Sequence, residues 1–70
     1  MQRLTGTYYL TQECPILAIT SVANYLGKTY IDSENLHKIS ECEYFMDLDT
    51  IYLVKQPSKF SFVVQVFEDI

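Results

Sequence analysis

The chain has 70 residues and a formal net charge of −4 at pH 7, with nine acidic residues against five basic ones. This length allows one small domain (residues 1–70), and a hydrophobic share of 49% excludes a disordered chain. The acidic balance argues against direct nucleic-acid binding. No apolar run reaches the roughly 18 residues of a membrane span, and the N-terminus lacks a signal-peptide pattern, so we expect a cytoplasmic protein with no membrane partner.

The first half of the chain predicts one strand and one helix. Residues 4–11 are rich in β-branched and aromatic side chains and predict a short strand or extended arm, although Gly6 weakens it. A helix is predicted over residues 15–26, because Pro15 suits its first position and Gly27 suits its C-terminal cap. Between these two residues, apolar side chains recur at the spacing of a buried helix face: Ile16, Ile19, Val22, Ala23 and Leu26.

A second, short helix is predicted over residues 33–40. Asp32 would be its N-cap, and Ile31 and Leu36 have the spacing of a hydrophobic staple. Leu36 and Ile39 would then face inward.

The last third of the chain predicts a β-hairpin. Residues 50–55 are apolar and branched, residues 56–59 form a turn, and residues 60–67 alternate. One face of the second strand carries Phe60, Phe62, Val64 and Val66, and the other carries Ser61, Val63, Gln65 and Phe67. Because both faces are apolar, we expect this strand to be central or paired with another chain. A short helix pair cannot cover two faces of a sheet, so we expect a homodimer or a complex.

Together these elements predict the fold class α+β, with two short helices packed on a small antiparallel sheet that ends in the C-terminal β-hairpin. Cys14 and Cys42 are the only cysteines, and their spacing does not suggest zinc. We expect reduced thiols rather than a disulfide, because small secreted domains usually carry several bridges.

Cys14 stands directly before the predicted first helix, which is where papain-like enzymes place their nucleophile. The stretch Gln12-Glu13-Cys14-Pro15, the apolar run 17–19 and the ending Tyr25-Leu26-Gly27-Lys28 resemble the nucleophile helix of bacteriocin-processing, papain-like cysteine peptidases. Ser61-Phe62-Val63-Val64 is similar to the strand of that family that begins His-Phe-Val-Val. The resemblance implies a papain-like core with Cys14 as nucleophile. In the hydrolase alternative Gln12 would be the oxyanion donor, although it stands closer to Cys14 than the glutamine of the family does.

The chain departs from this family at the residues that carry the chemistry. Ser61 stands where the family has its histidine, Tyr8 where it has an oxyanion glutamine, and Pro15 where it has a glycine. The sequence ends nine residues after Ser61, before the acid that orients the histidine. His37 is the only histidine and thus the only candidate base. The resemblance is therefore to a degenerate, truncated relative, and no catalytic residue is favoured.

Segment 41–49 interleaves four carboxylates with aromatic and apolar side chains. It lacks the pattern of an EF-hand loop, so we expect no metal and no cofactor. The segment is either a solvated loop whose apolar residues pack on the core, or a docking surface for a protein partner with a basic surface. The candidate partner-binding residues are Glu41, Glu43, Tyr44, Phe45, Met46, Asp47 and Asp49.

The sequence therefore favours a small acidic, non-catalytic protein-binding module. By analogy with small acidic proteins of phages and mobile elements, it would inhibit or modulate a host protein. The alternative is a minimal papain-like cysteine hydrolase that uses Cys14 and Gln12. A decoy that mimics nucleic-acid charge ranks last, because −4 is a small charge for that task.

Overall fold

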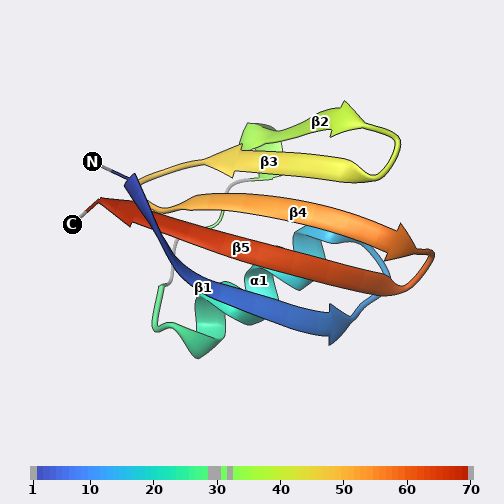
Figure 1. Cartoon of the computed structure of the whole chain (residues 1–70), viewed down its shortest axis with the longest axis horizontal. Coiled ribbons are helices and arrows are strands. Elements are labelled where there is room, and N and C mark those ends of the chain that lie inside the picture. Colours follow the sequence, from blue (N-terminus) through green and yellow to red (C-terminus); the bar gives the residue numbers. More distant parts are fainter. Residues whose placement is uncertain (1, 29–30, 32, 70) are drawn as a thin grey trace.

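A computed structural model describes residues 2–28, 31 and 33–69 of the chain (Figure 1). One helix lies behind a five-stranded antiparallel sheet whose strand order is β1-β5-β4-β3-β2. In chain order, the elements are β1 (Gln2–Thr11), α1 (Pro15–Tyr25), the 3-10 helix η1 (Ser33–Asn35), β2 (Leu36–Ser40), β3 (Glu43–Asp47), β4 (Ile51–Ser58) and β5 (Ser61–Asp69). The α+β class and the antiparallel sheet are confirmed. No described helix is both long and apolar enough to cross a membrane.

The predicted first helix is confirmed, and its end shows why the helix stops there. Gly27 adopts a φ of 76°, which a residue with a side chain rarely adopts. The Gly27 N–H donates to the carbonyl of Asn24 at 3.2 Å, and the Lys28 N–H donates to that of Ala23 at 2.8 Å. These two bonds form a Schellman motif, which satisfies carbonyls that the helix itself leaves free.

The C-terminal hairpin is also confirmed, with a later turn than predicted. β4 continues to Ser58, so the turn is at Lys59 and Phe60 rather than at residues 56–59. Pro57 is tolerated because the pairing of β4 with β5 shifts register between Lys55 and Ser58. β5 lies between β1 and β4, so the predicted central place of this strand is confirmed.

The predicted second helix is wrong. Only Ser33–Asn35 is helical, and Leu36–Ser40 is the edge strand β2. Pairing with β3, in which Leu36 is opposite Met46, outweighs a helix pattern that rested on two apolar residues. Ile39, predicted to face inward, is 58% exposed. The predicted N-cap Asp32 lies outside the described residues.

Segment 41–49 is not a loop. Its middle is β3, which pairs with β2 on one side and β4 on the other. Glu41 and Cys42 form the tight turn of the β2–β3 hairpin. The strand is hard to predict from the sequence of this segment, because carboxylates and apolar side chains do not alternate regularly along it.

The core lies between α1 and the sheet face that it covers. Every second residue of the central strands is buried there, as the pleat of a strand requires. Phe60, predicted to share this face, is 48% exposed because it belongs to the turn. The buried hydrophobic residues are Ala18, Ile19, Val22, Ala23, Met46, Tyr52, Val54, Phe62, Val64 and Val66.

Tyr52 is a core residue whose ionisation should limit stability in alkali. Its burial, and secondly the negative charge of Glu68, raise the pKa of Tyr52 above 10.0, while a hydrogen bond with Thr50 lowers it. The folded chain therefore holds this proton more tightly than the unfolded chain does. We expect the free energy of unfolding to fall as the pH rises above about 10, by at most about 1.4 kcal/mol per pH unit from this group.

Urea unfolding between about pH 9 and about pH 11 measures this loss. Tyr52→Phe should make the free energy of unfolding less dependent on pH over that range. Tyr9→Phe is the matched control, because Tyr9 is 78% exposed, and it should retain the wild-type dependence. Equal pH dependence in Tyr52→Phe and the wild type would contradict the expectation.

Candidate functional site

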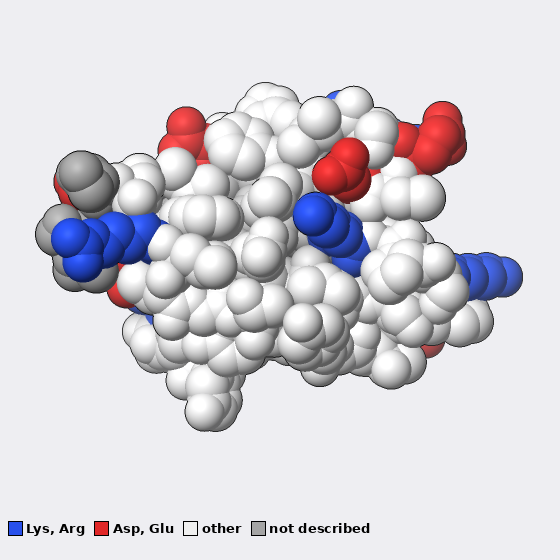
Figure 2. All heavy atoms as spheres, in the orientation of Figure 1, with Lys and Arg blue, Asp and Glu red and all other residues white. Residues whose placement is uncertain are grey.

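The second face of the sheet lies opposite α1, and within the described part of the chain no helix covers it. We call it the open face. Figure 2 shows it, because the sheet lies in front of α1 in this orientation. Successive side chains of a strand point to opposite faces of the sheet, so the residues between the buried ones point to the open face. The apolar residues of the open face are Leu4, Tyr9, Phe45, Ile51, Leu53, Val63 and Phe67.

Strand register brings these side chains together in rows across the sheet. In the first row Phe67 pairs with Ile51, which pairs with Asp47. The second row runs Gln65, Leu53, Phe45 and His37, and the third runs Tyr9, Val63, Lys55 and Glu43. Directly paired residues have Cβ atoms about 4.5–5.5 Å apart, so the apolar side chains within each row lie close together and form an apolar patch. Gln65 and Lys55 stand among them in the second and third rows.

Most charged groups lie at the border of this patch, and Lys55 lies within its third row. Figure 2 shows them toward the margins of the face, apart from one basic group beside an acidic group nearer its centre. Glu43 and Lys55 are opposite each other in the register of β3 and β4, and Asp47 lies at the other end of β3. The open face is therefore mainly apolar, with most of its charged groups at the border.

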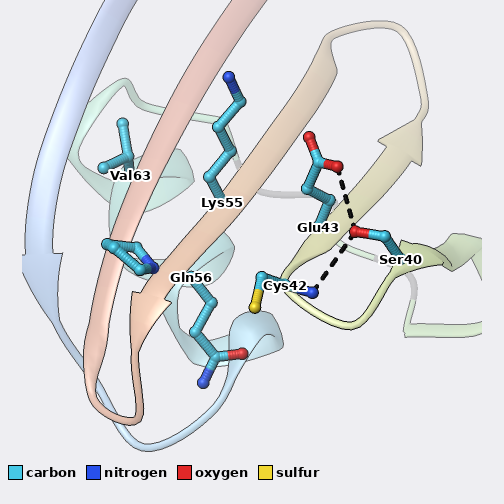
Figure 3. A pocket seen from close by; sticks show the side chains of 7 residues that line it. Ser40, Cys42, Glu43, Lys55, Gln56 and Val63 are labelled. Atoms are coloured by element: carbon cyan, nitrogen blue, oxygen red, sulfur yellow. Dashed lines mark hydrogen bonds between the residues drawn. The ribbon is translucent and has the colours of Figure 1, made fainter.

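A shallow hollow of about 410 Å³ lies at one end of the open face, where the β2–β3 turn meets β4 and β5 (Figure 3). The Ser40 hydroxyl donates to the Glu43 carboxylate at 3.1 Å and accepts the Cys42 N–H at 3.4 Å, which fixes the turn. The Gln56 N–H donates to the Cys42 carbonyl at 2.8 Å and ties the turn to β4. The hollow is lined by Ser40, Cys42, Glu43, Lys55, Gln56, Pro57 and Val63.

The residues predicted to bind a partner are divided between the two faces of the sheet. Glu43, Phe45 and Asp47 belong to the open face, whereas Tyr44 packs against the core on the side of α1. Met46 is 0% exposed, so its predicted role as a partner contact is wrong.

The other two predicted contacts, Glu41 and Asp49, are exposed in the turns at the two ends of β3. Sequence reasoning missed Ile51 and Leu53 as surface residues. The apolar character of both faces of the C-terminal hairpin was the signal that could have found them.

The residues of the proposed hydrolase do not come together. Cys14 is the N-cap position of α1, and its thiol makes no hydrogen bond that caps the described helix. The Gln12 side-chain amide donates to the Ser21 hydroxyl at 3.0 Å and so lies along α1. His37 lies on β2, at the opposite edge of the sheet from β1, and its ring packs near Phe45 at 6.2 Å between centroids.

Cys14 and Cys42 are both free thiols. The described residues contain no group of three or more His, Cys, Asp or Glu side chains that could hold a metal ion. Comparison of the chain with protein-family models, curated proteins and solved structures finds no match.

Proposed function

We propose that the chain is a non-catalytic protein-binding module whose contact surface is the open face. The observation that carries this proposal is the group of seven apolar side chains on a sheet face that lacks a covering element in the described structure. Antiparallel sheets that face water on one side usually alternate apolar and polar residues, with the polar ones outward. An apolar patch with a polar border is typical of a protein interface.

The shape of the surface favours a protein partner over a small ligand. Small-molecule sites are concave and bury most of the ligand, whereas the hollow beside Lys55 is shallow. A side chain of a partner fits such a hollow while the rest of the partner lies on the flat rows of the sheet. Phe45 and Leu53, in the middle row, are the expected anchors.

The charge around the patch favours a partner with a basic surface. Glu43 and Asp47 lie on β3, and Glu41 and Asp49 are exposed in the turns beside it. Carboxylates at the border of an interface accelerate the encounter with a basic partner more than they increase the final affinity. Inhibition or modulation of a larger protein is the form of this function that the small size and the acidity favour.

A cysteine hydrolase is the weaker alternative, and the resemblance to papain-like peptidases stays a prediction. A nucleophilic thiol needs a base within hydrogen-bond reach. The only histidine lies on the strand at the other edge of the sheet, and the Gln12 amide is bonded to Ser21.

A charge reversal at Asp47 tests the proposed function. A partner captured from the native cell is immobilised, and association and dissociation rates are measured by surface plasmon resonance at low and high salt. Asp47→Lys should slow association about tenfold at low salt, and the difference should shrink as salt screens the charges. Asp47 is preferable to Glu43, because the Glu43 carboxylate also holds the β2–β3 turn.

Glu13→Lys is the matched control, because it makes the same charge change at an exposed position before α1. It should leave the association rate near the wild-type value, with only the small effect of net charge. Equal slowing in both variants would show that the open face does not guide the partner and would contradict the proposal.

A further inference from the structure

β1 is a long edge strand with one side available for pairing. In the described part of the chain it is hydrogen-bonded only to β5, so its other edge presents free backbone N–H and C=O groups. Natural proteins usually protect such edges with charges, proline or bulges. β1 has these protections only at its start, where Arg3 is charged and the register shifts between Leu4 and Gly6. Residues 7–11 have none.

An aromatic surface lies next to this unprotected part of β1. Tyr9 and Tyr25 are each 78% exposed, and the ring of Tyr25 meets that of Tyr8 edge-on at 5.8 Å between centroids. A hollow of about 170 Å³ lies between β1 and α1 beside these rings. A tyrosine side chain has few rotatable bonds, and exposed tyrosines are typical of contact surfaces between proteins.

The distribution of acids indicates which partner fits this edge. Each chain carries a net charge of −4, so two copies repel each other unless their acid-poor sides meet. Five of the nine acidic residues lie on or next to β2 and β3, at the other edge of the sheet: Glu34, Glu41, Glu43, Asp47 and Asp49. Residues 7–11 contain no charged side chain, and the lower margin of Figure 2, along β1, is almost free of charged atoms.

From these observations we infer that two copies of the chain form a symmetric dimer by antiparallel pairing of residues 7–11 of β1. A two-fold axis across this edge places the same backbone groups opposite each other in both copies, so the hydrogen bonds are mutual. The two sheets become one ten-stranded sheet, with the acidic β2–β3 edges at its far ends. The inference does not depend on the proposed function, because the open faces of both copies stay uncovered.

Lysine at the centre of this edge should abolish the dimer. Tyr9 is the middle residue of the paired segment and is 78% exposed, so Tyr9→Lys would bring two ammonium groups together at the two-fold axis. Ile39→Lys is the matched control, because Ile39 is 58% exposed on the other edge strand, β2. Light scattering over a range of concentrations gives the mass of each variant, and circular dichroism checks its fold.

The wild type and Ile39→Lys should reach twice the chain mass of 8.2 kDa, and Tyr9→Lys should stay at 8.2 kDa. Amide hydrogen exchange of the wild type gives a second readout that needs no variant. Protection of residues 7–11 should rise with protein concentration, while that of β2 should not. A wild-type mass of 8.2 kDa at every concentration, or a dimer that protects β2 instead, would overturn the inference.

Discussion

Replacing Phe62 with alanine is expected to remove a large part of the free energy of unfolding. Phe62 is 1% exposed and lies on β5, between the strand and α1. A Phe-to-Ala change in a core costs about 3–5 kcal/mol, because it removes apolar contacts and leaves a cavity. A domain of this size has a free energy of unfolding of only about 4–10 kcal/mol. Urea unfolding followed by circular dichroism measures the loss.

Phe60 supplies a control of the same residue type two positions away. It is 48% exposed in the β4–β5 turn, where Lys59 lies over its ring at 5.2 Å. Phe60→Ala should therefore cost about 1 kcal/mol or less. Similar losses in the two variants would mean that β5 does not carry the alternation on which the assignment of the two sheet faces rests.

Phe45 and Met46 are neighbours on β3 that face opposite ways, so their replacement should separate binding from stability. Phe45→Ala should weaken the affinity for the captured partner about 30-fold or more, because truncation of an interface anchor costs about 2 kcal/mol or more of binding free energy. Its cost in unfolding free energy should be about 1 kcal/mol, because on the open face it loses mainly cross-strand contacts. The affinity is measured by surface plasmon resonance and the stability by urea unfolding.

Met46→Ala should show the opposite pattern. Met46 is fully buried, so its truncation should cost about 2–5 kcal/mol of unfolding free energy. The affinity of the fraction that stays folded should match that of the wild type. Equal affinity losses in the two variants, or an unfolded Phe45→Ala chain, would contradict the role of the open face.

Local signals in the sequence are enough to predict α1 and the C-terminal hairpin. Pro15 and Gly27 mark the two ends of α1, and the alternation after Ser61 marks a strand. Each of these segments carries its own pattern, so its structure can be predicted without its neighbours.

β2 and β3 could not be predicted in this way, because pairing decides their structure. Five residues with two apolar side chains suit one short helix as well as one strand, and only the partner strand decides between them. The same limit affects the candidate site. The sequence shows that Glu43, Phe45 and Asp47 share a segment with Met46, but only the register shows that Met46 faces the core.

Site-specific photo-crosslinking tests the role of the open face most directly. A photoreactive amino acid is placed in the native cell at Lys55, which is exposed on the open face, and in a second chain at Asn24, which is exposed on α1. Irradiation should attach a specific protein to the chain labelled at residue 55 and not to the chain labelled at residue 24. A specific adduct at residue 24 with none at residue 55 would contradict the open face as the binding surface.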